Sequence, residues 1–106
     1  MIKAILGYDI EPRLSEEEYD RWLREIHIPD LKRIPGLKKI VLNTVREKVR
    51  EGETFYRIAE LHYESWEDFR RASEWRKRNP LPPEHSPEGK TAFRFYVVCD
   101  SEEITV

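Results

Sequence analysis

The sequence contains only one cysteine, Cys99, so no disulfide can form within the chain. Chains without disulfides are typical of reducing compartments, and we therefore expect a cytoplasmic protein. The four glycines are spread singly, so they cannot build a loop that cradles phosphate groups. A nucleotide-binding fingerprint and a serine–histidine–acid set are absent too, so we expect any enzymatic activity to proceed without a bound nucleotide.

Long apolar runs and a one-sided charge are likewise missing. No stretch approaches the ~20 apolar residues of a membrane span, and residues 1–10 lack the pattern of a signal peptide, so we expect no membrane partner. The 19 basic residues nearly balance the 21 acidic ones, which leaves a net charge of −2. Such a balance gives no general attraction to nucleic acid, and we expect no nucleic-acid partner.

The chain is rich in charged and aromatic side chains. Charged residues make up 38% of it and aromatic residues 11%, including three tryptophans. Disordered chains usually carry charge of one sign and few aromatic residues, so this composition predicts a folded protein with a heavily charged surface. A length of 106 residues predicts a single domain over residues 1–106.

Residues 15–37 carry the strongest local signals in the chain. Ser15 and Glu18 have the spacing of a capping box, which predicts that a helix begins there. Apolar side chains then repeat every three or four residues, as on one face of a helix: Tyr19, Trp22, Leu23 and Ile26. His27 lies on the flank of this face, so a titratable ring is predicted beside the core.

Pro29 is expected to interrupt this helix. It has no N–H to donate to the preceding turn, and its ring crowds a carbonyl of that turn. It also disfavours helical angles at Ile28, so we expect a kink or short break just after His27 and a second helical piece over residues 30–34. Residues 35–36, proline and glycine, then end the helix.

The remaining pattern predicts an α+β fold of the ferredoxin-like type. Alternating or continuous apolar runs predict strands, and a second capping box predicts a helix that begins at Ser65; the strands cover residues 1–10, 37–49, 54–64 and 91–99. The order βαββαβ with right-handed crossovers gives a four-stranded antiparallel sheet with two helices on one face. The other face of the sheet is left uncovered, so we expect a second copy of the chain to cover it in a homodimer.

Finer expectations concern the hairpin and the faces of the elements. The second and third strands are expected to turn at residues 51–53. Alternation groups Leu37 with Val41 on the second strand and Phe93 with Phe95 on the last one. The basic residues near the end of the second helix are assigned to its solvent side: Arg70, Arg71, Arg76, Lys77 and Arg78.

Residues 79–90 contain four prolines and separate the second helix from the last strand. Proline reduces the freedom of the unfolded segment, so we predict an extended arm that packs in a fixed course against the pocket mouth or a partner subunit. Leu81 is expected to anchor it, and protonation of His85 at its outer end is expected to loosen the contact. The alternative is an exposed connector without a role.

These features resemble the EthD-type branch of the dimeric α/β-barrel superfamily. The resemblance rests on a first strand ending near Tyr8 and on a helix ending in His27 with Pro29 two residues later. It also rests on the sequence Pro-Gly-Leu at residues 35–37, which leads into the second strand. The resemblance implies a homodimer whose two sheets face each other, with a pocket between each sheet and its own helices.

The same resemblance implies candidate chemistry. Relatives include cofactor-free monooxygenases, polyketide cyclases, lactone isomerases and decarboxylases, and the family's functional histidine corresponds to His27. Many relatives follow the second helix with a shorter segment that carries an aspartate before an aromatic residue. Here residues 79–90 take that place, so the pocket mouth differs from the family's pattern.

The candidate site residues each have two interpretations. His27 can act as a general acid or base, or it can satisfy the backbone around Pro29. Candidate substrate-binding residues are aromatic or basic and can equally be core or ion-paired residues: Tyr8, Trp22, Arg57 and Tyr63. Glu60 and His62 can bind a metal or form a dimer contact, but three scattered histidines do not predict a metal site.

From these features we expect a small cofactor-independent enzyme that uses no nucleotide, metal or flavin. His27 would transfer a proton to or from a small apolar molecule, aromatic or polyketide-like. The reaction type, whether oxygenation, isomerisation, cyclisation or decarboxylation, is left open. The alternative is a non-catalytic module that binds a small ligand or assembles on the same dimeric scaffold.

Overall fold

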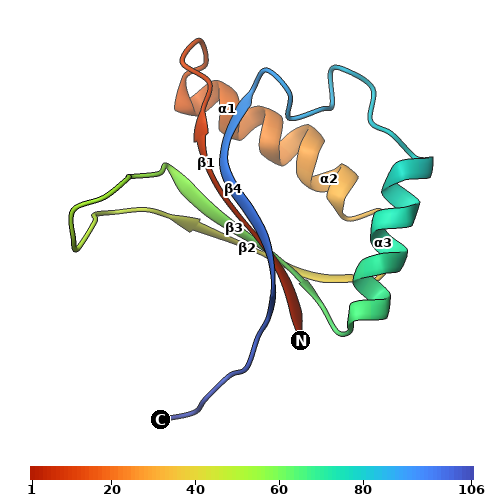
Figure 1. Ribbon diagram of the computed structural model, residues 1–106. Coiled ribbons are helices and arrows are strands. Elements are labelled where there is room, and N and C mark those ends of the chain that lie inside the picture. Colours follow the sequence, from red (N-terminus) through yellow and green to blue (C-terminus); the bar gives the residue numbers. More distant parts are fainter.

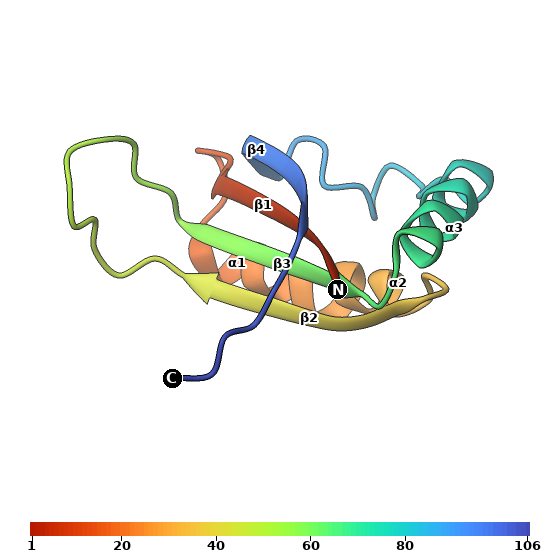
Figure 2. The ribbon, with the colours of Figure 1, turned by 60° about the horizontal axis from the view of Figure 1, so that its bottom comes forward.

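The computed structural model describes all 106 residues. Its elements follow in the order β1 (Ile2–Ile10), α1 (Glu16–Trp22), η1 (Leu23–His27), α2 (Ile28–Leu31), β2 (Leu37–Thr44), β3 (Arg57–Tyr63), α3 (Trp66–Arg78) and β4 (Thr91–Asp100). The strands form one antiparallel sheet in the order β2-β3-β1-β4, and the helices lie on one side of it (Figures 1 and 2). The ferredoxin-like α+β fold is confirmed. None of the helices has the length and apolar character needed to span a membrane.

The first helical segment continues without a break from α1 through η1 to α2. The expected capping box is present, since the Glu18 N–H donates to Ser15 Oγ at 3.1 Å. The segment then widens into the π-helical turn η1, in which the Ile28 N–H donates to the Leu23 carbonyl, and continues as α2. Ile28 keeps helical angles (φ −60°, ψ −44°), so the expected break after His27 is wrong. A π turn displaces the carbonyl that the ring of Pro29 would otherwise crowd, so the helix continues through the proline.

The hairpin between β2 and β3 is shorter than expected, and its loop is longer. The ladder ends where Thr44 pairs with Arg57, followed by one hydrogen bond from the Val45 N–H to the Tyr56 carbonyl. Residues 45–56 form a projecting, mostly exposed loop (Figure 1). The strands expected over residues 37–49 and 54–64 therefore extend too far into the loop, and their predicted ends beside it are wrong. The charged residues there have no apolar face to bury.

Two β-bulges decide which side chains of the edge strands face the helices. Arg94 is an extra residue between Phe93 and Phe95, so the alternation of β4 changes phase there. Phe93 faces the helices together with Tyr96, whereas Phe95 lies on the opposite face of the sheet. A register shift at the start of β2 likewise turns Leu37 toward the core. The expected faces of Phe93 and Leu37 are both wrong, because simple alternation cannot reveal a bulge.

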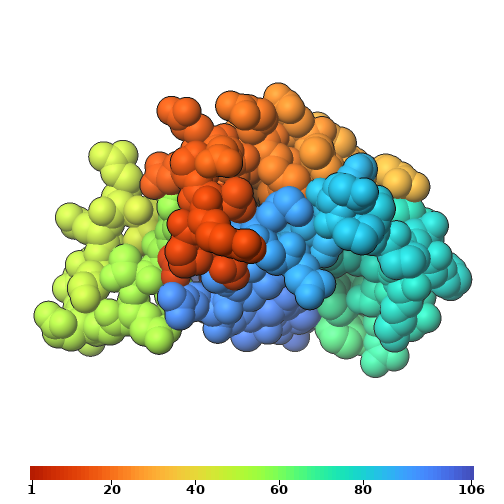
Figure 3. Space-filling model, turned by 90° about the horizontal axis from the view of Figure 1, so that it is seen from above, coloured from red at the N-terminus to blue at the C-terminus, as the bar shows by residue number.

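Two clusters of buried side chains fill the space between sheet and helices. One centres on Tyr63, Leu61 and Ala72 near α3, and the other on Tyr8 and Tyr19 near α1. Residues 79–90, here called the arm, lie between the first helical segment and α3, as Figure 3 shows in blue.

Candidate functional site

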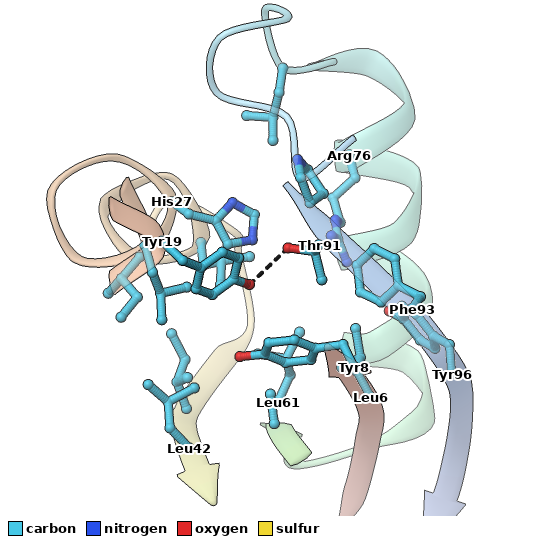
Figure 4. Close-up of a pocket in the computed structure, with 17 residues that line it drawn as sticks. Leu6, Tyr8, Tyr19, His27, Leu42, Leu61, Arg76, Thr91, Phe93 and Tyr96 are labelled. Carbon is cyan, nitrogen blue, oxygen red and sulfur yellow. Dashed lines mark hydrogen bonds between the residues drawn. The ribbon is translucent and has the colours of Figure 1, made fainter. Parts of the chain in front are cut away.

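An apolar cavity of about 100 Å³ lies between the sheet and the helices (Figure 4). Every strand and helical segment contributes to its 17 lining residues, of which 13 are hydrophobic. A closed apolar cavity of roughly 150 Å³ is known to accept benzene, so this one accepts one small group or part of a larger molecule. Its lining also includes a few groups that can form hydrogen bonds or carry charge: Tyr8, Tyr19, His27, Arg76, Thr91 and Tyr96.

His27 reaches the cavity from η1 (Figure 4). Its Nδ1 atom is buried and has no hydrogen-bond partner. Burial, assisted by the positive charge of Arg76, lowers the pKa of His27 from its ordinary value of 6.5 to about 4. Asp30 and the nearby backbone of His85 act in the opposite direction, although that backbone forms no hydrogen bond with Nδ1. At neutral pH the ring is therefore uncharged and can accept a proton.

Trp22 supports His27 from the side away from the cavity. The two rings stack, with their centroids 4.7 Å apart and their planes at 17°. The Trp22 Nε1–H donates to the Glu84 carbonyl at 3.3 Å, and the Lys90 ammonium lies 5.3 Å from the indole centroid. Trp22 is not part of the cavity lining, so it fixes the histidine and does not face a ligand there.

Four side chains of the lining carry hydroxyl groups: Tyr8, Tyr19, Thr91 and Tyr96. The hydroxyl groups of Tyr19 and Thr91 lie 2.7 Å apart and share a hydrogen bond (Figure 4). Burial raises the pKa of Tyr19 and of Tyr8, and at Tyr8 the charge of Arg57 opposes the effect. Both phenols are therefore neutral and can donate a hydrogen bond to an oxygen atom of a ligand.

Arg57 and Tyr63 lie outside the lining. The Arg57 side chain is only 5% exposed, and its Nη1 donates to Asp20 Oδ1 at 3.1 Å. Further hydrogen bonds join Arg57 to the hydroxyl groups of Tyr56 and Thr44. Tyr63 is buried against Phe69 in the core near α3. Of the four candidate substrate-binding residues, only Tyr8 shares the cavity with His27.

Sequence reasoning missed Tyr19, Thr91 and Arg76 as residues of the cavity. Tyr19 precedes His27 by eight residues, which is twice the four-residue spacing of one helical face. The sequence could therefore have predicted that the two side chains face the same cavity. Arg76 follows the buried Ala72 by four residues on α3. Arg76 is exposed, as expected, and it also lines the cavity, which the assignment to the solvent side did not predict. No pattern in the sequence marks Thr91 as a cavity residue, because its position depends on where the arm places the start of β4.

Glu60 and His62 lie on the face of the sheet away from the helices. The His62 Nε2 and Glu60 Oε1 atoms are 2.9 Å apart, and Asn43 Nδ2 donates to Glu60 Oε2 at 2.8 Å. Lys3 Nζ lies 3.6 Å from the same carboxylate. These hydrogen bonds, with the Asn43 bond first, lower the pKa of Glu60. No three His, Cys, Asp or Glu side chains gather in a way that could hold a metal ion.

The arm packs along the cavity mouth, with Leu81 and Pro87 in the lining. This course was one of the two expected from the sequence. The expected extended conformation is wrong, because the arm contains turns closed by backbone hydrogen bonds, from the Ser86 N–H to the Pro82 carbonyl at 3.1 Å and from the Thr91 N–H to the Pro87 carbonyl at 2.9 Å. His85 Nδ1 lies 2.9 Å from Asp30 Oδ2, which ties the arm to α2. Because this partner is a carboxylate, protonation of His85 strengthens the contact, so the expected loosening is wrong in sign.

Limited proteolysis is expected to distinguish the arm from the hairpin loop. Trypsin should cut the native protein first at Arg46, Lys48 or Arg50, which lie in the exposed loop, and about tenfold more slowly at Lys90. Lys90 is held by its hydrogen bond to the Ser86 carbonyl and by its contact with the Trp22 ring. Mass spectrometry of early fragments gives the order of cleavage, and early cutting at Lys90 would show that the arm is loose.

The chain is thus a small α+β domain of the ferredoxin-like type. Its apolar cavity between sheet and helices, which a histidine reaches from a π turn, is a candidate ligand site. A model of the EthD domain matches residues 11–80. This match spans more than half of the chain, and the protein belongs to the EthD family, as the residues around His27 and Pro29 had indicated. Among curated proteins, none is similar enough in sequence to count as a match.

Several solved structures share the fold over nearly the whole chain. An ethyl tert-butyl ether D (EthD) family protein from Bacillus halodurans is 13% identical, with a TM-score of 0.62 over 96% of this chain and 100% of that one. HapK from Hahella chejuensis is 4% identical (TM-score 0.64, 100% and 97% covered). At3g17210 from Arabidopsis thaliana is 15% identical (TM-score 0.65, 100% and 98% covered). At these identities the likeness extends to the fold alone.

Proposed function

We propose that the protein is a cofactor-independent enzyme that uses His27 as a general base on a small apolar substrate. The observation that supports this most is the state of His27 at the cavity wall: its Nδ1 atom is buried without a hydrogen-bond partner, and its ring is uncharged at neutral pH. A neutral imidazole beside an apolar cavity is ready to accept a proton from a bound molecule. We place this activity in the cytoplasm, as expected for a chain with one cysteine.

The low pKa of His27 limits the kind of substrate. A base whose conjugate acid has a pKa of about 4 accepts a proton readily only from a group that is already fairly acidic. A phenol, or a carbon atom activated both by a carbonyl group and by an aromatic ring or a second carbonyl group, comes nearest to this condition. The hydroxyl groups of Tyr8, Tyr19 and Thr91 can donate hydrogen bonds to the oxygen on which negative charge then develops. Proton abstraction of this kind can begin an isomerisation, a cyclisation or an oxygenation, whereas in a decarboxylation the residue would return a proton to the carbon that loses carbon dioxide.

A non-catalytic binding module is the second candidate. The support for it is the small volume of the cavity and its mostly apolar lining, which would retain a ligand without any chemistry. The two candidates differ in the role of His27: an enzyme needs its lone pair, and a binding module needs only its shape and its stack on Trp22.

The experiment is exchange of the benzylic protons of phenylacetone for deuterium, followed by NMR in deuterated water. Phenylacetone combines an apolar ring with a carbon acid and does not presuppose the natural reaction. The wild-type protein is compared with His27→Ala and with buffer alone. Exchange no faster than in buffer, although phenylacetone binds, would favour the binding module over the enzyme.

We also propose that a second copy of the chain covers the open face of the sheet. By strand alternation this face carries apolar side chains that no helix covers: Ile5, Val41, Ile58, Phe95 and Val97. Val97 is 46% exposed. A standard interface buries about 800 Å² per partner, and a dimer of the EthD type would place the two sheets face to face.

Substitution at this face should dissociate the dimer. Sedimentation equilibrium at micromolar concentration should show a dimer for the wild type and a monomer for Val97→Lys, because an unpaired ammonium group would be buried in the interface. We expect the dissociation constant to rise by about 100-fold or more. Val49→Lys is the matched control, since Val49 is 92% exposed in the hairpin loop and should leave the dimer intact. A wild-type monomer would contradict the proposal.

A further inference from the structure

Arg76 lies where two cavities meet. A second cavity of about 330 Å³ lies beside the first, between α2, the end of α3 and the arm, and both are lined by Leu31, Arg76 and Leu81. Its remaining walls are largely polar, with Trp75 and several charged or amide groups: Asp30, Arg33, Asn79 and His85. A ligand longer than the apolar cavity can therefore extend past Arg76 into a polar space.

The charges around this junction are unbalanced. Asp30, the only carboxylate of the second cavity, is already bound to His85 at 2.9 Å. On the same helix as Arg76, Arg71 pairs with Asp68, and Lys77 pairs with Glu74. Arg76 belongs to none of the ion pairs of the structure. Its guanidinium group is therefore free to bind an anion.

The second arginine of this cavity has a different setting. The guanidinium group of Arg33 lies 5.7 Å from the ring centroid of Trp75, so its face is occupied by the indole. Arg33 lines the second cavity alone and has no place in the first one. Arg76 is the basic side chain common to both cavities, so an anion bound by it lies at the edge of the apolar space that contains His27.

The geometry of the first cavity places Arg76 across from His27. The histidine enters from η1 on one side, and the arginine enters from α3 on the other (Figure 4). Arg76 is close enough to lower the pKa of His27, after the larger effect of burial. It also lowers the pKa of Tyr63, against the larger effect of burial, so its charge acts on the wall near α3 as well.

We propose that the substrate carries a carboxylate or a similar planar anionic group and that Arg76 binds this group at the junction of the cavities. The apolar part of the substrate then fills the first cavity, with its acidic proton toward His27. This inference rests on the proposed function, because it names the substrate class of the same site. A guanidinium group matches a carboxylate with two parallel hydrogen bonds, which fixes orientation as well as affinity.

The test compares charged ligands with neutral ones of the same shape. Phenylacetate and hexanoate are titrated beside phenylacetamide and hexanamide, and binding is measured by calorimetry. For the wild type we expect each carboxylate to bind about tenfold more tightly than its amide, as a charge-assisted pair predicts. In Arg76→Met this preference should fall to about twofold or less. Arg78→Met is the matched control, since Arg78 ends the same helix and lines neither cavity.

A second readout separates binding at Arg76 from a general effect on the fold. NMR titration of the His27 ring should show a higher pKa in Arg76→Met than in the wild type, because a nearby positive charge has been removed. Bound phenylacetate should raise the His27 pKa in the wild type and leave it nearly unchanged in Arg76→Met. Equal binding of acid and amide by the wild type, no binding of either acid, or a preference that survives Arg76→Met would overturn the inference. These measurements need no turnover, so they stand apart from the deuterium-exchange test of the proposed function.

Discussion

In His27→Ala the exchange of the benzylic protons of phenylacetone should fall by about 10²- to 10⁴-fold, to the rate in buffer. A general base positioned in the transition state contributes about this factor, and no other imidazole lines the cavity. His27→Gln should lose the same activity, because an amide can form hydrogen bonds but does not take up a proton at neutral pH. His85→Ala is the control, since His85 lies outside the first cavity and should retain most of the exchange rate.

The pH dependence gives a second signature of the same residue. His27 acts as a base only while its ring is neutral, so the wild-type rate should be level from neutral pH down to about pH 5 and fall as the pH approaches about 4. A histidine with an ordinary pKa would already lose activity near 6.5. A wild-type rate that falls near 6.5, or full exchange by His27→Ala, would contradict the assignment.

The same shift also has a consequence for stability that requires no substrate. The pKa of His27 is lower in the folded protein than in the unfolded chain, so between about pH 6.5 and 4 the unfolded chain binds more protons. The contribution of the neutral ring to stability is therefore present above pH 6.5 and is lost as the pH falls toward 4. Urea unfolding at several pH values should show this slope in the wild type, and the slope should be smaller in His27→Gln.

Tyr63→Ala should destabilise the fold by about 3–5 kcal/mol, the usual cost of removing a large aromatic side chain from a core. Tyr63 is 1% exposed, and its ring meets that of Phe69 at a centroid distance of 5.4 Å. Domains of this kind are stable by only about 5–15 kcal/mol, so the variant should be close to unfolding at 25 °C. Urea or thermal unfolding measures the change, and a loss below about 1 kcal/mol would show that this part of the core is loosely packed.

Tyr63→Phe separates packing from ligand binding. It retains the ring, so stability should change by about 1 kcal/mol or less. Because Tyr63 lies outside the cavity lining, binding of phenylacetone and its exchange rate should change by no more than about twofold. A tenfold loss of binding in a stable Tyr63→Phe protein would instead support the substrate-binding role that the sequence suggested for Tyr63.

The sequence by itself determined the order of the elements and the place of the candidate base. The capping residue Ser15 and the helical stripe fixed one face of α1, and His27 follows on its flank, so its position beside the core depended only on local spacing. The apolar alternation of β1 identified Tyr8 as a core residue for the same reason. Local periodicity is a property of neighbouring residues, which is why such positions can be predicted without knowledge of the fold.

Only the tertiary structure decided which residues share the cavity. The π turn that keeps the helix continuous at Pro29 and the bulge at Arg94 both depend on packing partners from other elements. Arg76 lines the cavity because α3 and the arm bring it across from His27, and the carboxylate partner of His85 comes from α2, 55 residues away in the chain. Contacts between distant segments leave no periodic pattern in the sequence. The place of Arg76 in the cavity and the carboxylate partner of His85 could therefore be recognised only in the folded structure.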